Sequence, residues 1–321
     1  MRNPLLSVVV PVYKVEKVLE RCLDSLLVQS MSEIEILLID DASPDRCGEI
    51  CKEYAEKDKR ITVLRHSVNK GLSAARNLGI QHASCNWLMF VDSDDYVHVD
   101  FCKAAYECAV KYQADLVMFN RIRVMDPEDA VRNIPDADPA FSEGYLTRQE
   151  AIDLMLTDGG NAAWNKLYRR ELFAGISYPE GYLYEDTGAT YKLVAKASRV
   201  YYLNKGLYYH CYRIDSITAR KTTKKELKDR SELNSQRYRD LVAWGYQSER
   251  LEYRIKKFAL WYLQRKKRDM ADPDYVFLAK RLVAGEIPKG FSWKERFAVF
   301  LFRFFPSVFD MICSFFGKKI A

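Results

Sequence analysis

The stretch WLMFVDSDDY, residues 87–96, joins an apolar run to a group of carboxylates and decides how the fold is interpreted. Its first five residues are apolar and have the length of a buried strand. Three carboxylates follow within four residues, at Asp92, Asp94 and Asp95. Because crowded like charges repel one another, a cation must offset them: solvent ions, Arg and Lys of the protein, or a bound metal ion.

Similar apolar, β-branched runs recur through the first 120 residues and alternate with helical patterns. The other runs lie at residues 6–10, 34–39, 61–64 and 116–119. Strands that alternate with helices predict a Rossmann-like α/β domain with a mostly parallel, doubly wound sheet covered on both faces. In such folds, ligands bind beyond the carboxyl ends of the strands. Polar side chains fall in these places at Asp40 and Asp41 as well as at residues 92–95.

The second half of the chain has weaker but usable patterns. Two Tyr-rich runs, residues 200–203 and 207–212, predict a short hairpin that turns at Asn204-Lys205-Gly206. Beyond residue 222 the pattern is helical. We therefore expect an α/β domain over residues 1–220, a basic helical extension over 221–290 and a Phe-rich tail over 291–321.

Charge and cysteine usage narrow the class of protein. The net charge is +6, yet residues 213–268 hold 17 Lys and Arg against 7 Asp and Glu. Such an excess is either solvated helical surface or a patch that attracts anionic membrane or phosphorylated substrate. The eight cysteines lack paired zinc-site spacing, and the first residues lead directly into a strand-like run. Reduced thiols, no secretory signal and a cytoplasmic protein are therefore expected.

The tail is amphipathic. Between residues 297 and 316, 15 of 20 residues are apolar and 8 are Phe, while Arg303, Pro306 and Asp310 interrupt the run. Each charge would cost roughly 2.5–3.5 kcal/mol at the centre of a membrane span, which disfavours a spanning helix. A helix lying in the membrane interface is the preferred interpretation, and packing onto the body of the protein is the alternative.

The D-x-D group Asp92-Ser93-Asp94 suits a divalent cation that bridges the phosphates of a nucleotide. Mg²⁺ and Mn²⁺ take oxygen ligands and need only one or two protein carboxylates. The cation would neutralise a departing diphosphate. Acidic triplets are frequent in loops, so this motif alone is weak evidence. Phosphate binding by a glycine loop is not supported, since Gly71 and Gly79 lack the required spacing.

Several segments, taken together and in order, resemble the family 2 glycosyltransferases of the GT-A fold. The first four resemble the N-terminal domain of that family: SVVVPVYKVEKVLERCLDSLLVQ (7–29), LLIDDAS (37–43), NKGLSAARNLGI (69–80) and FVDSDDYV (90–97). Three more segments resemble the branch of this family that builds bacterial surface polysaccharides: WNKLYRRELF (164–173), YEDTGATYKL (184–193) and YHCYRIDSIT (209–218). The resemblance as a whole covers roughly residues 5–215.

The resemblance implies an inverting, metal-dependent transfer of a sugar from a nucleotide-sugar, usually a UDP-sugar, to an acceptor hydroxyl. The transferred group would be a hexosyl or N-acetylhexosaminyl residue, and the cofactor Mn²⁺ or Mg²⁺. The acceptor would be a lipid-linked glycan, and the protein would lie peripherally on the inner face of the plasma membrane. No nucleic-acid partner is implied.

The family pattern also implies donor-site roles for matching residues. Pro11, Val12 and Tyr13 would line the base pocket, and Asp41 would accept a hydrogen bond from uracil. The nucleotide would further be surrounded by Asn69, Gly71, Arg76, Asp92, Ser93 and Asp94. Of the two D-x-D carboxylates, Asp94 would be the direct metal ligand and Asp92 would lie nearer the ribose.

Inversion requires a base that takes the proton of the acceptor hydroxyl. By the family pattern this base is Asp186, and Glu185 is a supporting acceptor contact. From the residues alone, a helix N-cap is the favoured role for Asp186, which precedes Thr187 and Gly188.

The remaining roles each have a structural alternative. His210 would complete the metal shell, or would be a packing residue of a Tyr-rich strand. Arg213, with Ser216, would close over the diphosphate. Trp164 and Lys166 would border the acceptor site, where an aromatic face can stack on a sugar ring; the alternative is a core Trp.

Two other functions are considered. A nucleotidyltransferase on a similar sheet would carry a Gly- and Arg-rich phosphate loop near the first strand, and PVYKVEKV (11–18) has none. A non-catalytic glycan- or membrane-binding protein would not need Asp92, Asp94 and Asp186 together.

Overall fold

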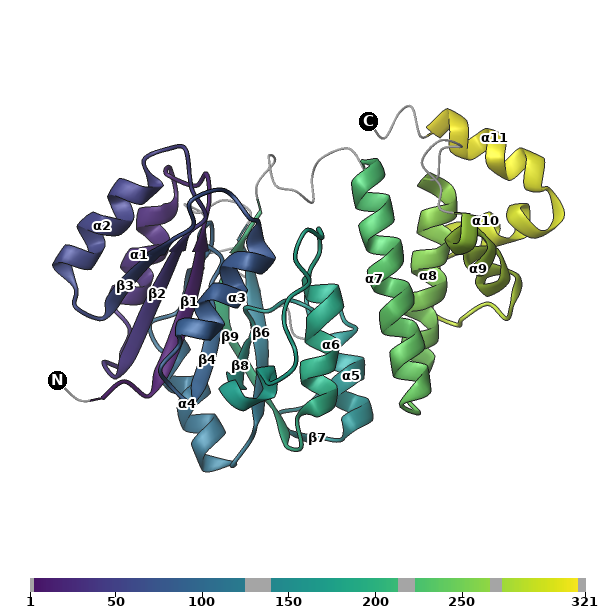
Figure 1. The fold of residues 1–321 in the computed structure, drawn as a ribbon. Helices are drawn as coiled ribbons and strands as arrows, with labels where there is room; N and C mark the ends of the chain where they lie inside the picture. Colours follow the sequence, from purple (N-terminus) through teal and green to yellow (C-terminus); the bar gives the residue numbers. More distant parts are fainter. Residues whose placement is uncertain (1–2, 125–139, 213–222, 266–272, 317–321) are drawn as a thin grey trace. The chain divides into compact units, whose positions relative to one another are not determined.

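The computed structural model describes residues 3–124, 140–212, 223–265 and 273–316. The chain divides into two compact units, an α/β unit (Met1–Ile214) and a helical unit (Asp215–Ala321) (Figure 1). The predicted boundary at residue 220 and most of the Pro-rich stretch after residue 125 lie outside the described residues.

The first half of the α/β unit alternates strands with helices, as the apolar runs predict. Its elements are β1 (Leu6–Val12), α1 (Leu19–Leu27), β2 (Ile34–Asp40), α2 (Cys47–Lys57), β3 (Ile61–Arg65), α3 (Leu72–His82) and β4 (Trp87–Phe90). Every residue of β1 is buried, which fits its run of Val and Leu. The helix α1 buries Leu19, Cys22, Leu23 and Leu26, which recur on one helical face.

The second half completes a mixed sheet. It contains β5 (Tyr96–Val97), α4 (Phe101–Lys111), β6 (Leu116–Val124), β7 (Gly144–Leu146), α5 (Arg148–Met155), β8 (Lys166–Arg169), the short 3-10 helix η2 (Arg170–Phe173), α6 (Asp186–Lys196) and β9 (Val200–Cys211). The strand order is β3-β2-β1-β4-β8-β6-β9-β5, and β7 pairs with β9.

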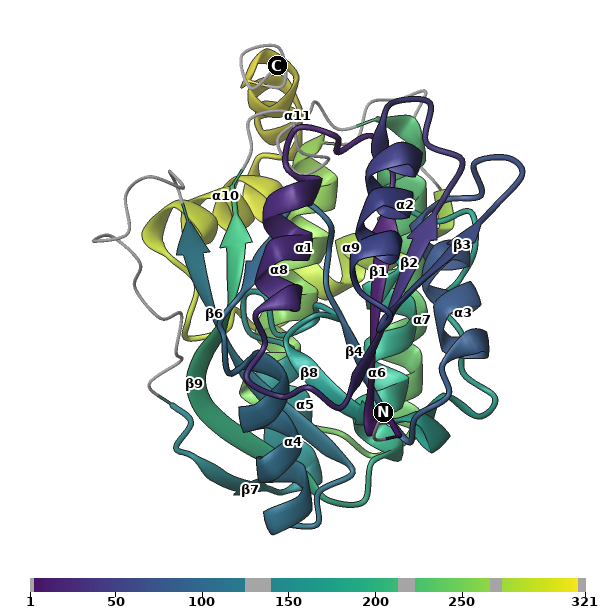
Figure 2. The ribbon, with the colours of Figure 1, turned by 90° about the vertical axis from the view of Figure 1, so that its left-hand side faces the viewer.

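Six of the nine strands formed by the described residues run in the same direction, and β5, β7 and β8 run against them. Helices cover both faces: α1 and α4 lie on one face, and α3 and α6 on the other (Figures 1 and 2). This arrangement confirms the predicted mostly parallel, doubly wound α/β sheet.

The predicted hairpin at residues 200–212 is wrong. This segment is one continuous strand, β9, and it runs parallel to β6. Phe119 is opposite Leu203, whereas the next residue, Asn120, is opposite Gly206, so the residues between them form a bulge. The Asn120 side chain donates a 2.7 Å hydrogen bond to Asn204 Oδ1 across this bulge. Asn-Lys-Gly is therefore used here for a bulge instead of a turn.

Two helices begin with a capping box, a Ser or Thr followed three residues later by Glu. Thr147 and Glu150 begin α5, and Ser292 and Glu295 begin α10 (Trp293–Phe304) with the same reciprocal hydrogen bonds.

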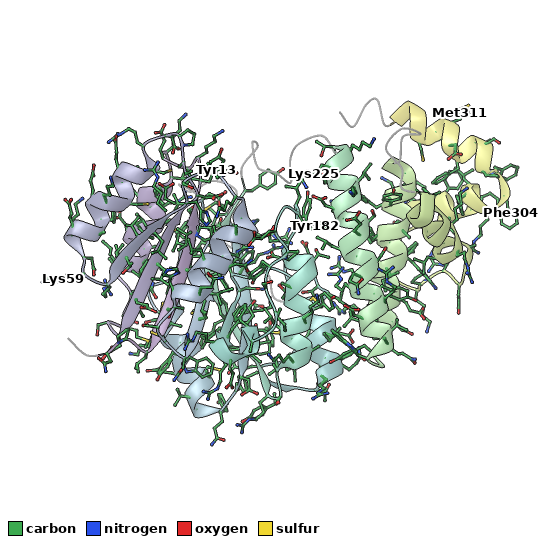
Figure 3. All side chains as sticks on the ribbon, in the orientation of Figure 1. Tyr13, Lys59, Tyr182, Lys225, Phe304 and Met311 are labelled. Atoms are coloured by element: carbon green, nitrogen blue, oxygen red, sulfur yellow. The ribbon has the colours of Figure 1, made fainter. Side chains whose placement is uncertain are left out.

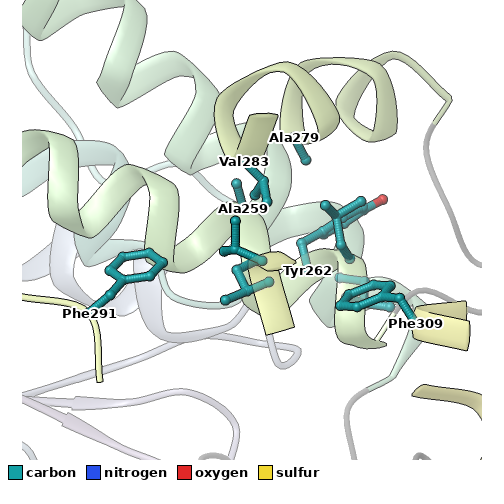
Figure 4. Packing of buried hydrophobic residues seen from close by; sticks show 10 residues of the cluster. Ala259, Tyr262, Ala279, Val283, Phe291 and Phe309 are labelled. Atoms are coloured by element: carbon teal, nitrogen blue, oxygen red, sulfur yellow. The ribbon is translucent and has the colours of Figure 1, made fainter. Parts of the chain in front are cut away.

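The helical unit contains α7 (Lys224–Ala243), α8 (Glu249–Arg265), α9 (Pro273–Ala284), α10 (Trp293–Phe304) and α11 (Pro306–Phe316). Its core contains Ala259 and Tyr262 of α8 and Phe309 of α11 (Figure 4). Phe291, which precedes α10, and Val299 of α10 belong to the same core. The Phe-rich tail thus contributes to the same core as the basic extension. Within the described residues, the helices are too short or too polar to cross a membrane.

Candidate active site

The predicted donor residues meet where the parallel strands end. Asp41 follows β2 and donates its backbone N–H to Val12 O at the end of β1, at 3.0 Å. Val91, which follows β4, bonds in the same way to Val9 O at 3.0 Å. Since β2, β1 and β4 are neighbours and parallel, the carboxylates that follow β2 and β4 lie along one edge of the sheet.

The centre of the site is Arg76, which lies on α3 and is 1% exposed. Its Nη2 donates to Asp92 Oδ1 at 2.8 Å, and its Nη1 donates to Asp186 Oδ1 at 3.0 Å. The same Nη1 also bonds to the Glu185 carboxylate. One guanidinium group therefore joins the D-x-D turn after β4 to the Glu-Asp pair at the start of α6.

Electrostatics fix Arg76 in its charged form. Burial alone would lower its pKa, but the carboxylates of Asp92, Asp186 and Glu185 outweigh burial, and the pKa is raised well above its ordinary value. The guanidinium carbon lies 5.3 Å from the centre of the Tyr178 ring, a distance at which the ring attracts the cation.

Asp186 is the first residue of α6, and the N-cap position is occupied by Glu185, without a side-chain capping bond. The interpretation of Asp186 as a simple N-cap is therefore wrong. Burial raises the pKa of the Asp186 carboxyl to about 7; Arg76 opposes this rise, and Glu185 and Asp92 add to it. Its side chain is still 21% exposed, so another molecule can reach the carboxyl group. A carboxyl group with these properties suits general-base chemistry near neutral pH.

The turn that carries Asp92, Ser93 and Asp94 is held by residues of distant segments. Buried Asp95 accepts hydrogen bonds from Tyr208 Oη at 2.7 Å and from the Cys211 backbone N–H at 2.8 Å. Burial, together with the charges of Asp94 and Asp92, raises the pKa of Asp95 well above its ordinary value. Asp95 therefore has a structural role in this turn.

Asp41 organises the loop before α3. Its carboxylate accepts hydrogen bonds from His66 Nδ1 at 2.7 Å, Asn69 Nδ2 at 2.8 Å, the Lys70 backbone N–H at 2.9 Å and the Gly71 backbone N–H at 2.7 Å. Gly71 has a φ of +89°, a conformation that a side chain disfavours. Asp41 thus positions Asn69 and Gly71, two of the predicted donor residues.

The predicted base pocket lies after β1. Pro11 and Val12 are buried, whereas Tyr13 is 38% exposed and labelled at the edge of the α/β unit in Figure 3. Lys14 and Ala42, which directly follow the predicted pocket residues, have left-handed backbones with φ of 56° and 53°. Strained backbone of this kind is concentrated at functional sites in proteins.

Trp164 and His210 form a stack with Tyr208. The Trp164 ring is 4.2 Å from the Tyr208 ring and 5.4 Å from the His210 ring, nearly parallel to both. Trp164 is 5% exposed. Burial lowers the pKa of His210, and Arg121 adds to this effect, so that the imidazole is neutral at neutral pH. A neutral imidazole is the form that binds metals.

Lys166, two residues after Trp164, is completely buried. Its ammonium group donates to Gly160 O and Ala162 O at 2.6 Å and to Asn165 Oδ1 at 2.7 Å. Burial lowers the pKa of Lys166 to about 7, while these three acceptors match the three protons of the charged form. Lys166 therefore fixes the loop before β8, and a contact with an acceptor would be made through that loop.

The donor set fits a hard divalent cation completed by phosphate. Asp92 is an oxygen donor whose side chain is 26% exposed, and Asp94 follows two residues later on the same turn. Across the described part of the chain, no group of three His, Cys, Asp or Glu residues is arranged to hold a metal by itself. Mn²⁺ and Mg²⁺ commonly bind one or two protein carboxylates together with phosphate oxygens. Arg213 lies outside the described residues.

Sequence reasoning missed three residues that the structure places at the site. They are His66, which bonds to Asp41, Tyr178, which covers Arg76, and Tyr208, which holds both Asp92 and Asp95. Only Tyr208 had a usable signal, because residues two apart on a strand share a face, and Tyr208 is two residues before His210.

A doubly wound α/β unit with carboxylates gathered beyond its parallel strands belongs to the class of proteins that bind ligands at that edge. Within this class, the chain belongs to glycosyltransferase family 2: the sequence profile "Glycosyl transferase family 2" matches residues 7–176.

Individual relatives agree with this family. The chain is 35% identical over 255 residues to "Glycosyltransferase GlyA" of Streptococcus pneumoniae serotype 4, covering 76% of this chain and 36% of GlyA. It is 37% identical over 224 residues to "Uncharacterized glycosyltransferase EpsJ" of Bacillus subtilis, covering 67% of this chain and 63% of EpsJ. The chain therefore spans less than two thirds of the length of either relative.

A solved structure agrees in fold. The crystal structure of Staphylococcus aureus TarS 1-349 in complex with UDP-GlcNAc superposes with a TM-score of 0.73 at 21% identity, covering 98% of this chain and 90% of that chain. The predicted GT-A fold is thereby confirmed.

Proposed function

We propose that the protein transfers a sugar, with inversion, from a nucleotide-sugar to an acceptor hydroxyl. The observation that carries this proposal is the position of Arg76, which bonds both to Asp92 on the donor side and to Asp186. Membership of family 2 supports a glycosyltransferase, and the UDP-GlcNAc bound to TarS supports a UDP-sugar donor carrying a hexosyl or N-acetylhexosaminyl group.

The donor binds along the edge of the sheet. Pro11, Val12 and Tyr13 receive the base, and Asp41 acts on the nucleotide both directly and through the loop that it holds. Asn69 and Gly71 lie on that loop and face the nucleotide together with Arg76 and Ser93. The charge of Arg76 is already shared among three carboxylates, so it orients Asp92 more than it attracts phosphate.

The D-x-D turn would hold Mn²⁺ or Mg²⁺, with Asp94 as the direct ligand, Asp92 nearer the ribose and neutral His210 able to complete the shell. When bound, the cation would neutralise the diphosphate as it leaves. Asp95 keeps this turn in place through Tyr208 and Cys211. Arg213, beyond β9, is proposed to contact the same diphosphate.

Asp186 is the base. Its unprotonated carboxylate accepts the proton of the acceptor hydroxyl while that oxygen attacks the anomeric carbon from the side opposite the leaving group. The hydrogen bond from Arg76 holds the carboxylate in one orientation and leaves its second oxygen for the acceptor. Glu185 is also bonded to Arg76 and supports the acceptor side.

The acceptor is proposed to be a lipid-linked glycan of surface polysaccharide synthesis, met at the inner face of the plasma membrane. Trp164 and the loop fixed by Lys166 border the acceptor side, with the Trp164 ring oriented by its stack on Tyr208.

A panel of nucleotide-sugars tests this function. With Mn²⁺ present, we expect release of nucleoside diphosphate from a UDP-sugar, and loss of that release in chelator. Asp186→Asn serves as the comparison, because removing the base slows attack by water as well as by an acceptor. The proposal is overturned if every nucleotide-sugar stays intact while a sugar phosphate and a nucleoside triphosphate give pyrophosphate, which is nucleotidyl transfer.

A further inference from the structure

The helix α10 has two apolar faces. One face packs inward through Val299, which is 2% exposed and belongs to the core of the helical unit. The opposite face carries Trp293, Phe297, Phe300 and Phe304, spaced by four, three and four residues, with exposed fractions of 73%, 53%, 45% and 66%. This spacing places the four rings on one stripe of the helix.

The exposed stripe continues onto α11. Phe305, Val308 and Met311 are 50%, 38% and 64% exposed, whereas Phe309 between them is buried. The Phe300 ring lies 5.1 Å from the Phe304 ring and 5.9 Å from the Phe305 ring. Figure 3 labels Phe304 and Met311 on these two helices. We call these seven residues, four on α10 and three after it, the aromatic face.

The aromatic face is large for a surface left in water. Aromatic side chains have areas of about 150–250 Å², so the exposed parts of its five rings together make roughly 600 Å². The largest apolar patch on a monomeric soluble protein is about 300–600 Å² and is often functional.

Charge is separated between the two units. Residues 215–321 contain 24 Lys and Arg and 13 Asp and Glu, a net charge of +11. Residues 1–214 contain 26 Lys and Arg and 31 Asp and Glu, a net charge of −5. Exposed Lys294 directly follows Trp293 in the sequence, and exposed Lys289 precedes Trp293 by four residues and lies 3.8 Å from Glu249. The unit that exposes the aromatic face is therefore strongly basic.

We propose that the aromatic face inserts into the interface of a bilayer that contains anionic lipid, with α10 and α11 lying in the plane of the membrane. Aromatic rings on one helical face, with basic residues around them, are the composition of interfacial membrane helices. The inference deepens the proposed function, since it names the surface that brings the enzyme to a lipid-linked acceptor. All the residues that support this membrane proposal lie in the helical unit.

Charge also favours a lipid surface over a second copy of the chain as the occupant of the aromatic face. Two helical units joined through their aromatic faces would bring two net charges of +11 together, which repel. An anionic lipid surface attracts the same charge, by about 1 kcal/mol for each Lys or Arg close to it. An α10 that is apolar on both sides is explained when one side meets the core and the other meets lipid.

Co-sedimentation with vesicles tests the proposal. The full chain is mixed with vesicles of phosphatidylcholine alone or with about a third of phosphatidylglycerol. The double variant F300E/F304E changes the centre of the aromatic face. The control V242E/W244E changes two apolar residues at the end of α7 that are 44% and 50% exposed. We expect at least a tenfold loss of binding for F300E/F304E, none for the control, and weaker binding to the neutral vesicles.

Three results would overturn the proposal: a wild-type chain that stays in the supernatant, an F300E/F304E variant that sediments like wild type, and equal binding to neutral vesicles. If the wild-type chain dimerises through the aromatic face, it should stay in the supernatant, and its mass in solution would show the dimer. Calorimetric UDP binding keeps the two proposals apart. Unchanged UDP binding by F300E/F304E together with lost sedimentation supports both, whereas a wild-type chain that sediments with vesicles but does not bind UDP removes the donor site alone.

Insertion of the aromatic face into the bilayer can be measured separately by tryptophan fluorescence. Trp293 is the most exposed residue of the aromatic face, at 73%. Vesicles should shift tryptophan emission to the blue in the wild type. Trp293→Phe should sediment within about twofold of wild type, because a similar apolar area remains, and should lose the shift. A shift that survives in Trp293→Phe would show that the face lies away from the lipid.

Discussion

Arg76 Nη1 lies 3.0 Å from Asp186 Oδ1, although the two residues are 110 positions apart in the sequence. The other nitrogen of the same guanidinium group, Nη2, bonds to Asp92 at 2.8 Å. The carboxylate that we assign to the donor and the one that we assign as base therefore share one buried cation. Changes on either side are therefore expected to be felt on the other.

Replacing Asp186 by Asn should lower turnover by at least about 10²-fold while donor binding is largely kept, because the amide cannot take a proton. The measurement is steady-state transfer together with calorimetric UDP binding. Asp100→Asn is the matched control, since this exposed carboxylate precedes α4 and bonds to Ser30. Turnover of Asp186→Asn equal to that of the control would remove Asp186 as the base.

The pH profile should report the Asp186 carboxyl. Burial raises its pKa to about 7, and the base is active only after it loses its proton. We therefore expect kcat/KM to rise with pH up to about pH 7 and to level off above it, since this ratio reports the free enzyme. A profile that is flat through the acidic range, or that falls as the pH rises toward 7, would contradict the assignment.

Arg76→Lys should move that acidic limb to higher pH. Arg76 lowers the pKa of Asp186, and a lysine ammonium cannot reach three carboxylates with the geometry of a guanidinium fork. A less well compensated Asp186 holds its proton more tightly. The control is Arg60→Lys, at a partly buried Arg that bonds to Asp58 at 2.8 Å. If both variants keep the wild-type pH profile, the link between Arg76 and Asp186 has no catalytic consequence.

Asp95→Ala should destabilise the protein by about 1–3 kcal/mol, because it leaves the buried Tyr208 hydroxyl and the Cys211 N–H without their acceptor. Turnover should fall as well, since the D-x-D turn loses its anchor. Urea unfolding measures the first effect. An Asp95→Ala protein as stable as wild type would show that Asp95 does not hold the turn.

Much of the α/β unit could be predicted from the sequence because its determinants are local. The β-branched runs around Val9 and Leu37 became neighbouring strands, and the capping boxes at Thr147 and Ser292 began helices where their spacing indicates. The hairpin prediction failed because Asn-Lys-Gly suits a bulge as well as a turn, and the choice was made by pairing with distant Asn120.

The site could be predicted only in part, because only some of its residues are placed by local patterns. Carboxylates that directly follow strands, such as Asp41 and Asp92, are placed by the local pattern. The contacts that join them are not local: Arg76 comes from α3 and meets Glu185 and Asp186 of a much later segment. The burial of Lys166 likewise depends on the 160–165 loop, which no motif describes.

The most direct test of the central claim is calorimetric titration of UDP into the protein with Mn²⁺ and in excess chelator, using wild type and Asp94→Asn. If the carboxylates after β4 hold a cation that in turn holds the diphosphate, wild type should bind UDP at least about tenfold more tightly with Mn²⁺. Asp94→Asn should lose that gain. Equal UDP affinity with Mn²⁺ and in chelator, in both proteins, would contradict the account.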